Sequence, residues 1–320
     1  MRTITWPDTV DEILDGDHVV MLAYVTPANG VVLTPVTNFG VRDRAAGTVT
    51  VNSSVGAWKK LDRMRRNPHV ALAFHTRRHA THGRHEYVLV QGRAKLSEPI
   101  PDYPSSILEH WERFERWRDL SPLWKRWLRV YALRVGIEVA VDRIVVWPEL
   151  DARGTPTVIG APLASEPAPE QPAPAKGSGP RVNHKRGAKR AARLPDVLLG
   201  WLGADGLPLV VPVTVAGREE RGIVLEPPPG LVPPGGRRAG LTAHRFSRNV
   251  VGQHQRIHTG WLRARPPERQ VAYAPHTQAA YRFPPSTLLY HTLTGLFTRL
   301  RVRQAKRSGL FSSSGSCGCA

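Results

Sequence analysis

The sequence predicts a mainly β protein: a small antiparallel β-barrel with flanking helices, followed by a second, degenerate copy of that barrel. Segments rich in β-branched and aromatic residues alternate with turn residues through residues 18–150. Only short connections join most of them, which favours antiparallel pairing over a doubly wound parallel sheet. The pattern then begins again, because residues 21–41 and 198–218 each contain an apolar strand, an Asx-Gly turn and a strand with Pro-Val-Thr.

The elements of the first unit follow from their boundary residues. A short opening helix begins after Pro7 and is closed by Gly16, and a second helix is predicted over 55–67. A third helical region, 105–135, is broken where Ser121 caps a helix that begins with Pro122. Strands are predicted at 18–26, 30–41, 47–54, 69–76, 86–97 and 137–150.

Aromatic side chains recur at helical spacing within 105–135. Such a stripe indicates packing in a core or an interface more than a cage for a substrate. The residues are Trp111, Phe114, Trp117, Trp124 and Trp127.

A Pro/Ala-rich and then basic segment, 161–196, separates two units. Its second half, "KRGAKRAAR", has no apolar periodicity, which is typical of an exposed linker. We therefore predict a first domain at 1–150, a linker at 151–194, a second domain at 195–310 and a disordered tail at 311–320. After its first hairpin, the second domain has predicted strands at 239–244, 260–265 and 271–275 and a helix at 285–304.

The charge of the chain favours anionic partners. Its 320 residues include 45 Lys and Arg against 26 Asp and Glu, a net charge of +19. Phosphorylated cofactors, nucleic acid and acidic lipid all suit such a balance. No apolar run approaches the roughly 18 residues of a membrane span, and the acidic N-terminus does not resemble a secretory signal. The two cysteines, Cys317 and Cys319, form no disulfide framework. We expect a soluble, cytoplasmic protein.

Residues 47–74 have the pattern of a phosphate site. A strand ends in Ser53 and Ser54 and is followed by a helix with Lys59 and Lys60 in its first turns. Free N–H groups and the helix dipole favour an anion there, and hydroxyl and ammonium groups can complete the site. The structural alternative is that the serines cap the helix and the lysines lie on its solvated face.

The segments "LAYVTPANGVVLTPV", "RMRRNPHVAL", "YVLVQGRAKL" and "RIVVWPEL" together resemble the pyridoxamine 5′-phosphate oxidase-like split-barrel flavoproteins. The likeness is closer to the actinobacterial-type flavin/deazaflavin oxidoreductases of that superfamily. It covers about residues 5–150 and, in the second unit, only the first hairpin. The resemblance implies an FMN-binding split barrel in the first domain and a degenerate, split-barrel-like second domain.

The resemblance also implies roles for particular residues. Lys60 matches the phosphate-contacting lysine of the family, and Ser53 and Ser54 match the hydroxyl positions beside it. Thr37 and Asn38 lie on the strand that faces the isoalloxazine ring in such proteins. Family members form homodimers with cofactor sites at the interface, so a tandem chain can form a pseudo-dimer within itself, with homodimerisation as a further option. The second half has no equivalent lysine-helix, which predicts one site per chain.

The loop after the fourth predicted strand is rich in basic residues and histidine. Arg77 and Arg78 are predicted to reach an anionic cofactor tail. The spacing His79-x-x-His82-x-x-His85 lacks carboxylate or thiolate partners, so a solvated polar loop is favoured over a metal site, and no metal is predicted.

The function predicted first is an oxidoreductase that transfers hydride to or from a small conjugated or aromatic substrate. The cofactor would carry the chemistry, which explains why no Ser-His-Asp set or carboxylate pair is evident and why no catalytic residue is assigned. The fold favours FMN, whereas the net charge with Arg77, Arg78 and Arg84 would suit the long anionic tail of a deazaflavin coenzyme. FMN is the prediction and deazaflavin the alternative. A non-catalytic flavin-binding or storage protein is the second function considered, and a basic protein with non-specific nucleic-acid affinity the third.

Overall fold

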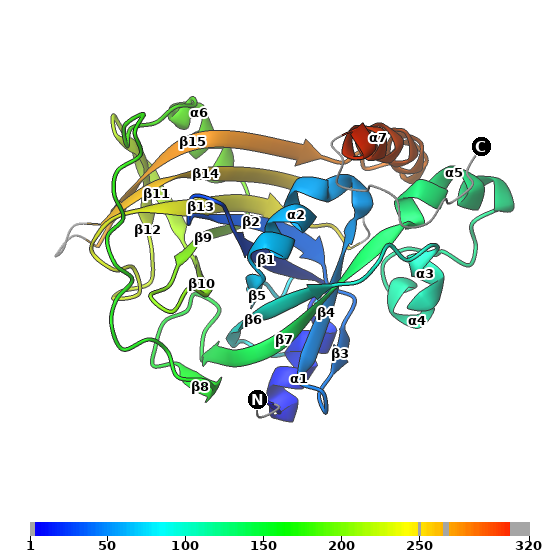
Figure 1. The fold of residues 1–320 in the computed structure, drawn as a ribbon, viewed down its shortest axis with the longest axis horizontal. Helices are drawn as coiled ribbons and strands as arrows, with labels where there is room; N and C mark the ends of the chain where they lie inside the picture. Colours follow the sequence, from blue (N-terminus) through cyan, green and yellow to red (C-terminus); the bar gives the residue numbers. More distant parts are fainter. Residues whose placement is uncertain (1–3, 249–250, 265–268, 308–320) are drawn as a thin grey trace.

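The computed structural model describes residues 4–248, 251–264 and 269–307 (Figure 1). Its first half folds into one antiparallel sheet. Six of its strands begin within three residues of the predicted positions, whereas the short strands at 41–43 and 157–160 were not predicted as separate strands. The strands of this sheet are β1 (Val19–Val25), β2 (Val31–Thr37), β3 (Val41–Asp43), β4 (Thr48–Ser54), β5 (His69–Phe74), β6 (Tyr87–Leu96), β7 (Arg134–Trp147) and β8 (Thr157–Gly160).

The second half folds into a sheet with the same strand order. The orders are β2-β1-β5-β6-β7-β4-β3 in the first sheet, where β8 also pairs with β7, and β10-β9-β13-β14-β15-β12-β11 in the second. The prediction of a mainly β fold with two related barrels in tandem is therefore confirmed. The second sheet comprises β9 (Asp196–Leu202), β10 (Pro208–Pro212), β11 (Thr214–Glu219), β12 (Gly222–Glu226), β13 (Gly235–Arg245), β14 (His254–Ala264) and β15 (Val271–Arg282).

The register of the strands shows how closely the halves correspond. Leu22 pairs with Leu72 in the first sheet, and Leu199 pairs with Leu241 in the second. Both sheets then have a bulge at a glycine: a Cβ on Gly92 would lie 2.1 Å from the Ala140 carbonyl oxygen, and one on Gly260 would lie 2.2 Å from that of Ala274. Only glycine permits these close approaches.

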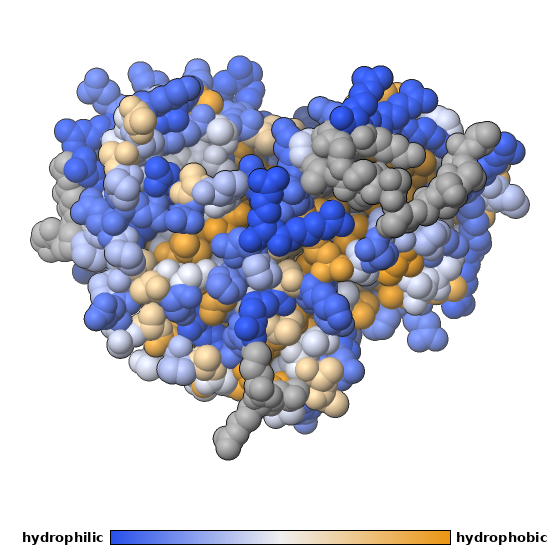
Figure 2. Space-filling model, viewed as in Figure 1, coloured by the Kyte–Doolittle hydropathy of each residue, from blue (hydrophilic) through white to orange (hydrophobic). Residues whose placement is uncertain are grey.

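The helices lie outside the sheets. The face that Figure 2 shows is hydrophilic with hydrophobic patches near its middle, and the exposed large hydrophobic side chains lie on the helices at 122–132 and 287–307. No helix within the described ranges is long and apolar enough to span a membrane. In Figure 1, α7 lies beside α5 near the end of β15. The helices are α1 (Asp8–Gly16), the 3-10 turn η1 (Val55–Ala57), α2 (Trp58–Arg66), α3 (Tyr103–Ser106), α4 (Leu108–Trp111), α5 (Pro122–Ala132), α6 (His184–Ala191) and α7 (Thr287–Arg307).

The helix predicted over 105–135 is wrong in its first part. Ile107 has a non-helical backbone and separates α3 from α4, so only α5 is a helix of three turns. Ser121 caps α5 as predicted, with its hydroxyl accepting from the Trp124 N–H. Packing of the aromatic residues is confirmed: Trp111, Phe114 and Trp117 are buried in one cluster, with Trp127 packed against it.

The basic run that was predicted to be unstructured is a helix. Asn183 caps α6 by accepting from the Arg186 N–H, and Gly187, Ala188 and Ala191 are buried against the second sheet. These small residues give no hydropathy signal, although they allow a close helix-to-sheet contact. We retain 151–194 as the proposed connection between the two domains.

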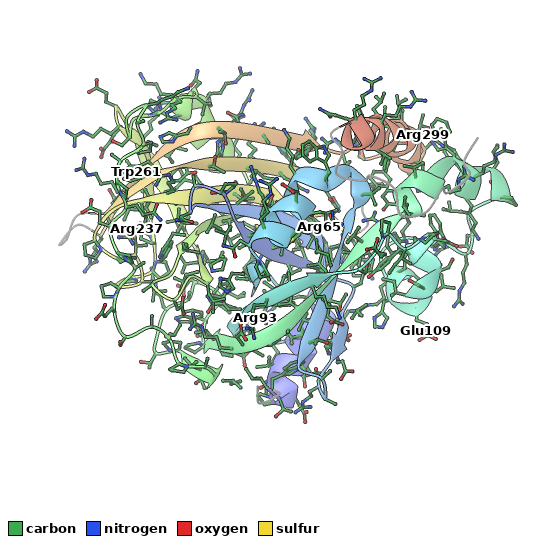
Figure 3. The ribbon with its side chains drawn as sticks, in the orientation of Figure 1. Arg65, Arg93, Glu109, Arg237, Trp261 and Arg299 are labelled. Atoms are coloured by element: carbon green, nitrogen blue, oxygen red, sulfur yellow. The ribbon has the colours of Figure 1, made fainter. Side chains whose placement is uncertain are left out.

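The Pro/Ala-rich part of the connection is bound along β13. Glu170 accepts from the Gly236 N–H at 2.9 Å. The guanidinium of Arg237, labelled in Figure 3, is buried and donates to the Ala168 carbonyl at 2.8 Å. The expectation of a segment exposed along its whole length is therefore wrong, because backbone carbonyls of the connection accept hydrogen bonds from a buried guanidinium.

The two sheets pack directly against each other. Residues of both halves share one buried cluster, in which Met21 and Leu33 meet Leu198 and Val210. The Thr242 hydroxyl donates to the Leu33 carbonyl at 2.8 Å across this contact.

One pair of histidines lies where the corresponding strands of the two halves meet. His75 and His244 each stand three residues beyond the paired leucines of β5 and β13, and their Nε2 atoms are 2.7 Å apart. Because His75 Nδ1 lies 2.9 Å from the Ala73 carbonyl, that nitrogen carries the proton and Nε2 accepts from His244. Burial lowers the pKa of His75 to about 4 and the pKa of His244 well below its usual value.

This pair predicts a loss of stability in acid. The unfolded chain takes up protons near pH 6.5, whereas His75 in the folded protein remains neutral until about pH 4, so stability falls as the pH falls through that range. The full contribution of His75 is about 3 kcal/mol. Urea unfolding between pH 7.5 and 5 should show a shallower loss in the His75→Gln/His244→Gln variant than in the wild type. His18 and His258, whose pKa values also fall to about 4, retain part of the slope. The exposed His85→Gln serves as control, and equal slopes in all three proteins would contradict the assignment.

Candidate functional site

A cavity of about 550 Å³ lies between the two halves of the chain. The first half contributes the end of β2, the end of β4, η1 and the start of α2. The second half contributes the start of β14, the end of β15 and one face of α7. Its volume is in the range of small-molecule sites, about 300–1,000 Å³.

The predicted phosphate residues come together in this cavity. Ser53, Ser54 and Lys60 all line it. Ser54 also caps η1, because its hydroxyl accepts from the Gly56 N–H at 3.2 Å, and that leaves the hydroxyl proton to donate to a ligand. The structural reading of Ser54 is therefore correct, and it does not exclude binding. α7 approaches closely here, since a Cβ on Gly56 would lie 3.0 Å from Arg301 Cβ.

Cations line the cavity without acidic partners. Lys60 is 9% exposed, and burial together with the nearby Arg134 guanidinium lowers the pKa of its ammonium to about 8. Arg134, Arg282 and Arg301 line the same cavity, and no Asp or Glu of the described chain does so. A buried ammonium without a counter-ion is unfavourable, so an anionic ligand would be held strongly here.

Of the residues expected beside the ring, Thr37 lines the cavity and Asn38 does not. Asn38 is buried and donates to the carbonyls of Leu14 and Asp17 at 2.8 and 2.9 Å, which fastens the end of β2 to α1. Lys59 likewise lies outside, with its ammonium 5.3 Å from the centroid of the Trp58 ring.

Arg77 and Arg78 are not part of this cavity. Arg77 donates to the fully buried carboxylate of Asp17 at 2.6 Å, and Arg78 is exposed. His82 also contacts Asp17, at 3.1 Å, so the loop is fastened to α1 and is not the solvated loop that was expected. Burial raises the pKa of Asp17 above its usual value. Within the described ranges no His, Cys, Asp and Glu cluster could hold a metal ion. Cys317 and Cys319 lie outside the described residues.

Several cavity residues were not predicted, and most come from segments far apart in the sequence. Tyr131 and Arg134 lie at the junction of α5 and β7, and Tyr290 and Arg301 lie on α7. Arg134 donates to Asn52 at 2.9 Å, and its guanidinium carbon lies 4.4 Å from the centroid of the Tyr131 ring. The helices themselves were predicted, but their pairing across the two halves has no local sequence signal.

A second cavity, of about 430 Å³, occupies the corresponding place on the other side of the contact between the sheets. Val51 of β4 pairs with Ile137 of β7, and Leu225 of β12 pairs with Val271 of β15. Val51 and Leu225 are therefore equivalent positions in the two halves, and so are the residues that follow each of them. Asn52-Ser53-Ser54 of the first half is matched by Glu226-Pro227-Pro228 of the second. Proline has neither hydroxyl nor N–H to donate, and glutamate repels anions. The second cavity thus lacks counterparts of the two serine hydroxyls that line the first.

The comparisons with known proteins concern the fold. No family model matches the chain, and no curated protein matches it. Solved structures match with 10–20% identity. They include a pyridoxamine 5′-phosphate oxidase-related, FMN binding protein from Nostoc punctiforme (11% identity, 46% of this chain, 87% of that chain, TM-score 0.31). General Stress Protein 26 from Bacillus anthracis (18%, 43%, 91%, 0.29) and an F420 reductase (16%, 42%, 94%, 0.30) also match. The descriptions of the first and third of these structures name kinds of protein that the sequence resembles. Each of the three matches spans most of the solved chain and less than half of this one.

Proposed function

We propose that the chain binds FMN, with the phosphate held by Lys60, Ser53 and Ser54, and acts as an oxidoreductase on a small organic substrate. The observation that carries the proposal is the partnerless Lys60 ammonium beside two serine hydroxyls in a cavity that no described carboxylate lines. When bound, the cofactor would supply the hydride chemistry. The residues of the chain would bind its phosphate, orient it between the two halves and exclude water.

The position of the basic loop favours FMN over the deazaflavin coenzyme. Arg77 is paired with Asp17, and Arg84 with Glu12, so neither guanidinium is free to reach a long anionic tail at the cavity. Deazaflavin remains the alternative because Arg282 and Arg301 line the cavity and could contact further anionic groups.

A non-catalytic flavin-binding or storage protein is the second candidate, because the same phosphate site would serve it. The test is to purify the full chain and to identify any small molecule that co-purifies with it. A yellow chromophore with the absorbance spectrum and mass of FMN is expected, and a deazaflavin mass would select the alternative. Turnover separates the two functions. If the reduced, protein-bound chromophore is reoxidised by organic acceptors no faster than reduced free FMN, the protein stores the cofactor and does not use it for catalysis. A colourless protein that takes up no flavin would overturn both.

The first prediction for this site compares neighbouring lysines. Lys60→Ala should weaken FMN binding roughly tenfold to hundredfold, about 1.5–3 kcal/mol, since it removes a charge-assisted contact to phosphate. Lys59→Ala, on the outer face of α2, should leave the affinity nearly unchanged. Because the Lys60 pKa is about 8, wild-type affinity should also fall above that pH, by up to about tenfold per unit. Fluorescence titration measures both effects, and equal curves for the two variants would show that Lys60 does not hold the phosphate.

The second prediction concerns the number of sites and the contribution of the second half. One FMN per chain is expected, because Glu226-Pro227-Pro228 replaces the donors in the other cavity. Arg301→Ala, on the cavity face of α7, should weaken binding several-fold, whereas the exposed Arg303→Ala should not. Two FMN per chain, measured by titration with light scattering to fix the oligomeric state, would contradict the single site.

A further inference from the structure

A line of polar side chains leads from the cavity into the protein between α5 and α7. The Tyr290 hydroxyl donates to the Tyr131 hydroxyl at 3.2 Å, and Tyr131 donates to Glu115 Oε2 at 3.2 Å. The other carboxylate oxygen lies 2.8 Å from His291 Nε2. Both tyrosines line the cavity, whereas Glu115 and His291 do not.

Each member of this line can both give and take a proton. A phenol hydroxyl donates once and accepts at its lone pairs, so the direction of the two hydroxyl bonds can reverse. The far end is a carboxylate and an imidazole, each with a side chain only 6% exposed, which can share an exchangeable proton. Burial raises the pKa of both tyrosine hydroxyls, so each phenol is neutral at rest, and the Arg134 guanidinium over the Tyr131 ring offsets part of this effect on Tyr131.

Attachment of α7 does not require this line. Trp127 Nε1 already donates to the His291 carbonyl at 3.1 Å, and Arg299, labelled on α7 in Figure 3, donates to the Trp127 carbonyl at 2.6 Å. The Arg299 guanidinium also lies 4.0 Å from the centroid of the Trp127 ring. A buried carboxylate is an unfavourable means of packing two helices, since apolar side chains of similar size serve at least as well.

We propose that Tyr290 and Tyr131 deliver the proton that accompanies hydride transfer, and that Glu115 and His291 replenish it. The inference rests on the proposed function. The substrate atom that accepts the hydride, a carbon in a conjugated carbonyl compound or an oxygen in a quinone, forms its new bond to hydrogen with the electron pair of the hydride. The substrate is thereby reduced by two electrons and the cofactor is oxidised by two. The Tyr290 O–H bond breaks, its proton goes to the adjacent polar atom of the substrate, and its electron pair stays on the phenol oxygen. Tyr131 returns a proton to Tyr290 and receives one from the Glu115–His291 pair. Acceptors that need both hydride and proton, such as quinones and conjugated carbonyl compounds, are the substrate class that this arrangement fits.

The kinetic test separates proton delivery from cofactor binding and electron transfer by comparing two electron acceptors. Menadione takes two electrons and needs protons, whereas ferricyanide takes one electron and no proton. In the FMN-loaded full chain, Tyr290→Phe and Tyr131→Phe should slow reoxidation by menadione roughly hundredfold and leave that by ferricyanide nearly unchanged. Tyr273→Phe removes a buried hydroxyl of the second sheet, bonded to the Ala239 carbonyl, and should change neither rate.

A second readout uses the cofactor-free full chain labelled with carbon-13 at the tyrosine Cζ. Glu115→Gln should shift the Tyr131 resonance and Tyr131→Phe the Tyr290 resonance, while Tyr273 stays in place. Equal slowing with both acceptors would show that the line has a structural role only. Unshifted resonances would show that the hydroxyls are not bonded in a line. Either result would overturn the relay. A wild-type protein that binds FMN but reduces menadione no faster than free FMN would also overturn it. A protein that binds no flavin or deazaflavin would overturn the proposed function instead.

Discussion

The close packing of the two sheets is the constraint on which the rest of the structure depends. β2 of the first half lies against β9 and β13, and β10 of the second half lies against β1 and β5. A Cβ on Gly240 would come within 2.5 Å of the Val31 carbonyl oxygen, so the two backbones almost touch. Tyr87 and Gln91 add hydrogen bonds to the carbonyls of Val210 and Pro208, both at 2.6 Å. This contact holds β15 and the rest of the second sheet beside the first, and α7 lies against both α5 and η1, so that Lys60 faces a cavity between the two halves.

Covalent fusion allows the two cavities to differ. In a symmetric dimer of identical chains, every residue of one site recurs in the other. Here Ser53 and Ser54 could be kept while their counterparts became Pro227 and Pro228, and η1 with α2 could be lost from the second half. The two halves have equivalent residues where these support the fold, at the glycine bulges and at the histidine pair. They differ at the residues that line the two cavities, where a ligand would bind.

The sequence predicted features that depend on neighbouring residues and failed for those that depend on distant ones. Alternation and turn residues located six of the eight strands of the first sheet, and a strand ending in Ser53 before a helix with Lys60 located two residues that line the cavity. β12 was not predicted, because a strand of only five residues that is followed directly by three prolines gives a weak sequence signal for a strand. Arg77 was assigned to the cofactor because the local pattern does not show that Asp17, sixty residues earlier, holds it. Tyr131 and Tyr290 meet across 159 positions, and no periodicity indicates that contact.

The electrostatics of the cavity explain why the site needs the stability of two sheets. Burial lowers the pKa of Lys60, and Arg134 is close enough to lower it further, so the charged ammonium is disfavoured by loss of hydration and by repulsion. Such a site is tolerated when the surrounding structure fixes it, and here the fixing elements belong to both halves: Arg134 is held by Asn52 of β4, and Arg301 lies against Gly56. An anion at this point would relieve the repulsion and join the two halves through one ligand. Binding of the proposed anion would therefore also stabilise the packing of the sheets, since its cavity is formed by that contact.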